Sequence, residues 1–187
     1  TAHDFVYSYQ RMVNPDEANP YAGFYYDIKN ALSINRGEIK DLAQLGIRAI
    51  DDLTVVIETE KAAPYLPYIV SFGNAFAVPR WQVEKYDRKW TLLGNIVSNS
   101  GFKLGEWVNG SHMTFVSDPH YNGPHKPYVE KVIHPFREAA TATILPYENN
   151  EVDIEVVDIT DLDRIGKDPH LSRDLVKVAA RGSWYLF

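Results

Sequence analysis

An Asn-Gly pair at Asn109 and Gly110 is the sequence feature that most constrains the fold of this chain. It separates two strand-like runs, 102–108 and 111–117. A type I′ turn needs positive φ at both central residues, so Asn-Gly is the strongest short-range signal of a two-residue hairpin loop. With Ser111 the same letters also match an N-glycosylation acceptor, but the turn explains both flanking runs. The sequence therefore predicts a hairpin over 102–117 with a type I′ turn.

Helical and strand-like segments are mixed along the rest of the chain, which predicts an α+β or mixed α/β fold. Apolar residues recur at helical spacing over 5–13 after an N-cap at Thr1, and Asn14 before Pro15 ends this helix. A β-rich hairpin is predicted over 47–59, with Asp51 and Asp52 in its turn. Further strands are predicted at 129–136, 152–155 and 175–179, and further short helices at 138–145 and 158–165.

Composition excludes several classes of function. The net charge of −6 and the scattered Lys and Arg residues argue against nucleic acid as a partner. The absence of cysteine excludes disulfides, zinc-thiolate sites and Cys nucleophiles within this chain. No apolar run reaches the roughly 18 residues of a membrane span. The 12 Tyr residues suit a binding surface that tolerates varied ligands, with core packing as the alternative.

No catalytic or metal motif stands out. The chain has no Gly-x-Ser-x-Gly elbow, its His residues are dispersed, and no Gly-rich loop leads into a helix, so no cofactor is predicted. Asp118, His120 and His125 could ligate a metal, but their Pro- and Gly-rich loop fixes no ligand geometry. We therefore expect no metal site.

Carboxylates leave one enzymatic alternative. Glycoside hydrolysis needs two carboxyl groups held across a cleft. Asp51 and Asp52 are better explained by a hairpin turn, and residues 151–155 by a short solvated strand. A hydrolase using Asp153 or Glu155 remains the enzymatic alternative, and a carbohydrate-binding module using exposed Trp and Tyr the other.

An ordered set of short motifs covers essentially the whole chain. In order, these are the Thr-Ala-x-Asp start and Asn-Pro stop within 1–21, the hairpin at 45–54, Pro64-Tyr65, Pro79, the Lys-Trp-Thr, Gly-Asn-Ile-Val and Leu-x-x-Trp elements of 89–107, Asp-Pro-x-Tyr at 118–121 and Glu-Val-Asp-Ile at 151–154. This set resembles the oligopeptide-type extracellular solute-binding proteins of bacterial ABC importers (family 5). One departure is Gly101, which lies one residue later than the family's usual Ser-Asn-Gly.

The resemblance implies a fragment of a two-lobed, type II periplasmic-binding-protein-like fold that lacks both ends of the receptor. Residues 1–80 would form a small α+β lobe, and residues 81–187 part of the hinge lobe, incomplete without flanking segments. The implied function is to capture extended oligopeptide between the lobes and deliver it to the permease. Such a receptor works outside the cytoplasm, is tethered by a lipid anchor outside this chain, and needs neither catalysis nor a cofactor.

The resemblance also implies the ligand contacts. Tyr21 matches a cleft-facing Tyr after the Asn-Pro step, and Ser183, Trp184 and Tyr185 lie on a strand near the cleft. Their expected roles are stacking and backbone hydrogen bonding, with core packing as the alternative for each. The family also includes receptors for dipeptides, nickel complexes and sugars, so peptide length, ligand class, permease partner and oligomeric state stay open at this point.

Overall fold

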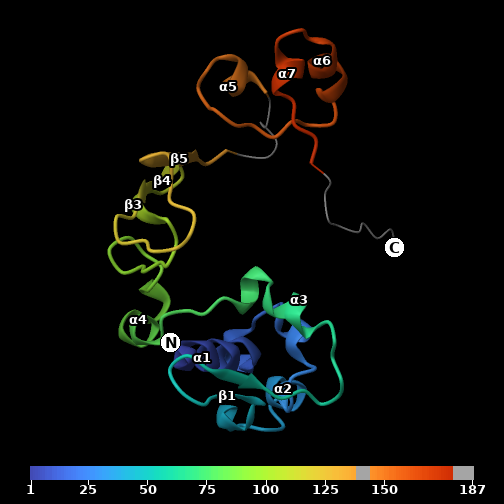
Figure 1. Cartoon of the computed structure of the whole chain (residues 1–187), viewed down its shortest axis with the longest axis vertical. Coiled ribbons are helices and arrows are strands. Elements are labelled where there is room, and N and C mark those ends of the chain that lie inside the picture. Colours follow the sequence, from blue (N-terminus) through green and yellow to red (C-terminus); the bar gives the residue numbers. More distant parts are fainter. Residues whose placement is uncertain (138–143, 179–187) are drawn as a thin grey trace. The chain divides into compact units, whose positions relative to one another are not determined.

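The computed structural model describes residues 1–137 and 144–178 (Figure 1). By contacts between Cα atoms the chain divides into two units, Thr1–Glu106 with Phe115–Val132, and Trp107–Thr114 with Ile133–Phe187. Helices and strands are mixed along the chain, as predicted. The assignment of 1–80 and 81–187 to two lobes concerns a complete receptor and stays a prediction.

The N-terminal helix, α1 (Ala2–Val13), forms as its sequence predicts. Thr1 is the N-cap; its hydroxyl donates a hydrogen bond to the Asp4 carboxylate at 3.0 Å, and the Asp4 N–H donates to the Thr1 carbonyl at 3.1 Å. Asn14 is extended, with φ −63° and ψ 122°, which suits a residue before Pro15. Three short 3₁₀ helices and one short α-helix follow: η1 (Pro15–Glu17), η2 (Ala22–Tyr25), α2 (Ala31–Asn35) and η3 (Leu42–Gln44).

The first predicted hairpin is present with shorter strands than expected. β1 (Ile47–Ala49) pairs antiparallel with β2 (Val55–Ile57), and Ile47 lies opposite Ile57. The carboxylate of Asp51 accepts hydrogen bonds from the Leu53 N–H at 2.8 Å and the Thr54 hydroxyl at 3.0 Å. The Ile50 N–H also donates to the Thr54 carbonyl at 2.9 Å, so residues 50–54 form the turn between the shorter strands.

The hydrophobic core lies in the first unit, where α1 packs against this hairpin and the short helices. Its buried members are Tyr9, Met12, Val13, Tyr25, Ile28, Ala31, Ile34, Leu45, Ile47 and Ala75. The rings of Tyr9 and Tyr25 meet edge to face, with centroids 5.6 Å apart. This aromatic pair joins α1 to the loop around η2 in the middle of the core.

Residues 66–90 continue the first unit as α3 (Leu66–Val70), η4 (Gly73–Ala75), α4 (Arg80–Tyr86) and η5 (Asp87–Lys89). Two hydrogen bonds attach this stretch to α1: the Val78 N–H donates to the Ser8 hydroxyl at 2.8 Å, and the Arg80 N–H donates to the Asp4 carboxylate at 3.2 Å. The start of α4 is thereby held against the start of α1.

The second hairpin belongs to a three-stranded sheet of order β3-β4-β5, formed by β3 (Phe102–Val108), β4 (His112–Ser117) and β5 (Lys131–Pro135). The hairpin is confirmed, but the predicted type I′ turn is wrong. The Ser111 N–H donates to the Val108 carbonyl at 3.0 Å, and Gly110 has φ +70°, whereas Asn109 keeps a negative φ. Ser111 joins the loop, so only the glycine has to take up the left-handed conformation.

Gly101 lies where the chain approaches itself closely. Its carbonyl accepts a hydrogen bond from the Asp118 N–H at 2.8 Å, and a Cβ at position 101 would lie 2.9 Å from Cγ of Pro127. Such a distance leaves no room for a side chain, so the displaced glycine serves packing of the 118–127 loop rather than positive φ.

The second unit contains α5 (Leu145–Glu148), α6 (Leu162–Lys167) and α7 (Leu171–Asp174). The helix predicted at 158–165 begins four residues later, and residues 138–143 of the helix predicted at 138–145 lie outside the described residues. The strand predicted at 152–155 is wrong, because this segment is irregular. The strand predicted at 175–179 is wrong over residues 175–178, which are also irregular, and residue 179 lies outside the described residues. Within the described ranges neither segment has a neighbouring strand to pair its backbone N–H and C=O groups.

A membrane-spanning helix is not found in the described part of the chain, where every helix is too short or too polar to cross a bilayer.

Candidate ligand-binding site

Tyr21 is held on the surface of the first unit by the turn that follows α1. The side chain of Asn19 accepts a hydrogen bond from the Tyr21 N–H at 2.9 Å, and Tyr21 then precedes η2. Its side chain is 46% exposed. Within the described residues Tyr21 is therefore not part of the core, and its ring is available for contact.

Tyr21 lies at one end of a short row of exposed aromatic rings. Its ring stacks on that of Phe24, with centroids 6.2 Å apart and planes 14° apart. Phe24 in turn meets Phe72 at 5.7 Å with a 53° tilt. Phe24 and Phe72 are 54% and 52% exposed. We call Tyr21, Phe24 and Phe72 the aromatic face.

The backbone explains why these rings point outward. Within η2, Ala22 and Tyr25 are buried in the core, so the position between them that carries Phe24 faces the opposite way. The Phe24 N–H donates to the Tyr21 carbonyl at 3.1 Å, which keeps the two residues in one turn. Phe72 comes from a different segment, where the buried Ala75 donates its N–H to the Phe72 carbonyl at 2.8 Å.

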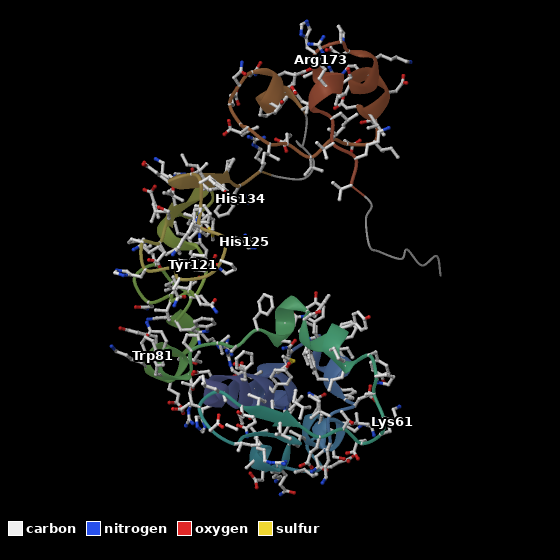
Figure 2. All side chains as sticks on the ribbon, in the orientation of Figure 1. Lys61, Trp81, Tyr121, His125, His134 and Arg173 are labelled. Atoms are coloured by element: carbon white, nitrogen blue, oxygen red, sulfur yellow. The ribbon has the colours of Figure 1, made fainter. Side chains whose placement is uncertain are left out.

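A polar cluster ties the 60–68 segment to the loop after η2. The Tyr65 hydroxyl donates to the Asp27 carboxylate, and the ammonium of Lys61, labelled in Figure 2, lies 3.4 Å from the same carboxylate. The Tyr65 hydrogen bond and the nearby Lys61 charge lower the pKa of Asp27. The cluster thereby links Tyr65, the N-cap residue of α3, to Asp27.

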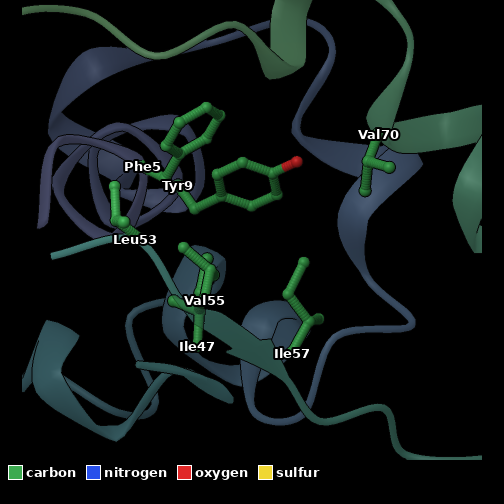
Figure 3. Close-up of a pocket in the computed structure, with 7 residues that line it drawn as sticks. All are labelled: Phe5, Tyr9, Ile47, Leu53, Val55, Ile57 and Val70. Carbon is green, nitrogen blue, oxygen red and sulfur yellow. The ribbon is translucent and has the colours of Figure 1, made fainter. Parts of the chain in front are cut away.

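A separate apolar cavity of about 350 Å³ lies between α1, the first hairpin and α3 (Figure 3). Its lining consists of Phe5, Tyr9, Ile47, Leu53, Val55, Ile57 and Val70. In Figure 3 the Tyr9 hydroxyl points toward the side of Val70 and is the one polar side-chain group among these residues. Burial raises the pKa of Tyr9 to about 12. The cavity offers apolar contact and very little polar recognition.

The structure does not support the enzymatic alternative with a facing pair of carboxylates among Asp51, Asp153 and Glu155. Asp153 is exposed on an irregular segment, and Glu155 is engaged in an ion pair with Arg137. Asp51 serves the turn of the first hairpin, where the Leu53 N–H and the Thr54 hydroxyl lower its pKa. These carboxylates occupy separate surroundings, whereas hydrolysis needs a facing pair.

The loop between β4 and β5, where Figure 2 marks His125, shows no metal site. Asp118 accepts a hydrogen bond from the His120 N–H at 3.0 Å, which is a turn contact. Over residues 1–137 and 144–178, no three side chains of His, Asp, Glu or Cys gather where they could share an ion.

Three predicted contacts, Ser183, Trp184 and Tyr185, lie outside the described residues. The sequence prediction named Tyr21, and it did not name Phe24 or Phe72, which the structure places in the same row of exposed rings. The spacing of Tyr21 and Phe24 within one short turn was visible in the sequence. Phe72 joins the aromatic face only through tertiary packing, and no local sequence pattern indicates this contact.

The family described as bacterial extracellular solute-binding proteins, family 5 Middle, matches residues 1–187. The periplasmic oligopeptide-binding protein OppA of Salmonella typhimurium is 33% identical over 156 residues, which are 82% of this chain and 28% of that protein. The probable deoxycholate-binding periplasmic protein YgiS of Escherichia coli is 30% identical over 89% of this chain and 31% of its own length.

The structure of OppA from Burkholderia pseudomallei superimposes with a TM-score of 0.80 at 29% identity, covering 89% of this chain and 33% of that one. This likeness confirms the predicted periplasmic-binding-protein-like fold. The chain thus spans about a third or less of the length of the proteins it matches.

Proposed function

Because the chain belongs to the bacterial extracellular solute-binding proteins of family 5, we propose that it forms part of a two-lobed receptor that captures oligopeptide for an ABC importer. The family predicted from the sequence is confirmed. The observation that carries the proposal is the family match over 1–187 together with 33% identity to a periplasmic oligopeptide-binding protein. Such a receptor works outside the cytoplasm and hands its ligand to a permease, and it is tethered by a lipid anchor outside this chain.

In the proposed receptor, residues 1–80 form the small lobe and residues 81–187 part of the hinge lobe. The ligand lies extended between lobes that close by a hinge motion. Backbone hydrogen bonds of the β-augmentation type give affinity without reading side chains. Capture of this kind breaks no covalent bond, so the proposal assigns no catalytic residue and no cofactor. The relatives described above are likewise named for what they bind.

Tyr21 is the proposed ligand contact that the structure supports best. Its ring is exposed, its backbone is fixed by Asn19, and it stacks on Phe24. A phenol offers both a flat apolar surface and a hydroxyl to an extended peptide. Ser183, Trp184 and Tyr185 remain proposed contacts from the family resemblance.

The test starts from the receptor that contains this chain. Mass spectrometry of the ligand that co-purifies with it should find peptides, and calorimetry should then give their affinity. Tyr21→Ala should weaken binding by about 5-fold or more, the effect of losing a central aromatic contact. Tyr68→Ala is the matched control, because Tyr68 is 79% exposed in α3 and lies outside the aromatic face.

Recovery of a sugar or a bile acid with no measurable peptide binding would contradict the proposed ligand class. Equal affinity of the wild-type receptor and Tyr21→Ala would remove Tyr21 from the site while leaving peptide capture in place.

A further inference from the structure

We propose that the aromatic face makes the receptor prefer peptides with an aromatic side chain at one fixed position along the peptide. This inference rests on the proposed peptide-binding function and names the feature of the ligand that Tyr21, Phe24 and Phe72 read. It assigns to Phe24 and Phe72 a role in specificity.

The aromatic face is exposed. Each of the three rings is about half exposed, at 46%, 54% and 52%, although large aromatic side chains are usually well buried. Their contacts run from Tyr21 to Phe24 at 6.2 Å and from Phe24 to Phe72 at 5.7 Å, so they form one continuous apolar surface. A further ring that docks there finds both a stacked and a tilted neighbour, which are favourable geometries for aromatic pairs.

The aromatic face is fixed before a ligand arrives. Tyr21 and Phe24 share one hydrogen-bonded turn, and their neighbours Ala22 and Tyr25 are anchored in the core. Phe72 donates its N–H to the Ile69 carbonyl at 3.1 Å and accepts from Ala75 at 2.8 Å. A face built on such anchored backbone loses little conformational freedom on binding.

The size of the aromatic face selects its occupant. Large aromatic side chains present about 150–250 Å² each, so three half-exposed rings offer roughly 300 Å². A stable protein–protein interface buries about 800 Å² on each partner. The face is therefore too small for a second copy of the chain to bind stably through it, and it matches one or two side chains of a peptide.

The geometry of an extended peptide then makes the preference positional. Successive side chains of an extended strand point to opposite sides, and backbone hydrogen bonds hold the strand in one register. A fixed face therefore meets the side chain at one position and leaves the others unread. Affinity comes from the backbone, and the aromatic preference is added at that position.

The experiment uses the receptor that contains this chain and a positional series of peptides. Tri-, tetra- and pentaalanine are compared by calorimetry with the variants in which Phe replaces one Ala in turn. We expect one position at which the peptide with Phe binds about 2- to 12-fold more tightly than the peptide with Ala, the effect of one aromatic pair. Phe24→Ala and Phe72→Ala should each bring this ratio close to 1, and Tyr68→Ala should preserve it.

The readout separates the possible failures. The ratio compares two peptides on the same protein sample, so it does not change if a variant folds less completely. A ratio that is flat in the wild-type receptor, or unchanged in both Phe variants, overturns the aromatic preference while peptide capture stands. Failure of the wild-type receptor to bind any peptide of the series overturns the proposed function, and the preference with it.

Discussion

At the scale of single residues, Asp87 is the clearest point of backbone strain in the described chain. It ends α4 with φ 48° and ψ −134°, a conformation that glycine adopts freely and residues with a Cβ avoid. We predict that Asp87→Gly raises the free energy of unfolding by about 1 kcal/mol, because the strain is relieved. Urea titration followed by circular dichroism measures the change.

The control for this prediction is Asp16→Gly. Asp16 lies in η1 and has no positive φ, so glycine there only adds freedom to the unfolded chain. Asp16→Gly should therefore lower the free energy of unfolding slightly. A drop of similar size for Asp87→Gly would mean that contacts of the Asp87 side chain stabilise the fold by more than its strained backbone conformation costs.

Tyr9 makes stability depend on pH in the alkaline range. Burial raises its pKa to about 12 in the folded state, whereas a tyrosine in an unfolded chain titrates near 10. Below pH 10 both states keep the proton, and the full stability is present. Between about pH 10 and 12 only the unfolded state releases it, so the free energy of unfolding falls by about 2–3 kcal/mol across this window.

Urea titrations at several pH values between 9 and 12 would measure this loss. Tyr9→Phe should flatten the dependence without abolishing it, because burial also raises the pKa of Tyr25. An identical slope in wild type and Tyr9→Phe would show that the Tyr9 proton is not the cause.

At the scale of elements, Gly46 is where three segments of the first unit meet. Its N–H donates to the Lys29 carbonyl at 2.9 Å, and its carbonyl accepts from the Glu58 N–H at 2.7 Å. A Cβ there would lie 2.7 Å from both the Glu58 carbonyl oxygen and Cβ of Lys29. We predict that Gly46→Ala lowers the free energy of unfolding by about 1–3 kcal/mol, the usual cost of overpacking.

Gly73→Ala is the matched control, since no atom lies within 4 Å of a Cβ at that position and its φ is not positive. Thermal unfolding of both variants should show a clear loss for position 46 and almost none for position 73. Equal losses would point to glycine's backbone freedom instead of the close approach.

Which elements could be predicted depended on whether their causes are local. The helix of residues 2–13 carries its own cap and stop, and each hairpin carries its turn residues, so these elements follow from nearby sequence. Residues 152–155 have the same alternation as a strand, but a strand also needs a partner, which a local pattern does not reveal. The site divides in the same way: Tyr21 follows a recognisable turn, whereas Phe72 joins it only through tertiary packing.

At the scale of the whole molecule, the match to a family identifies the fold without identifying the ligand. The TM-score of 0.80 to an OppA structure and the match over 1–187 concern the scaffold. Relatives of 30% to 33% identity include one named for oligopeptide and one named as a probable deoxycholate-binding protein, so likeness to a relative does not by itself identify the ligand. In the proposed receptor, ligand choice depends on surfaces such as the aromatic face, which substitutions can change without altering the fold.

The 187-residue chain by itself is expected to bind peptide only weakly. Ligand sites of this kind bury most of the ligand surface, and the chain spans only 28% of the length of its OppA relative from Salmonella. If a receptor binds peptide at about 1 μM, or roughly −8 kcal/mol, and the contacts divide evenly between two lobes, one wall supplies about −4 kcal/mol, or a millimolar affinity. We therefore expect calorimetry of the 187-residue chain with pentaalanine and its Phe variants to show at least about 100-fold weaker binding than the receptor. Micromolar affinity of the chain alone would mean that it carries nearly the whole site, and that the aromatic face and its surroundings bind peptide without an opposing lobe.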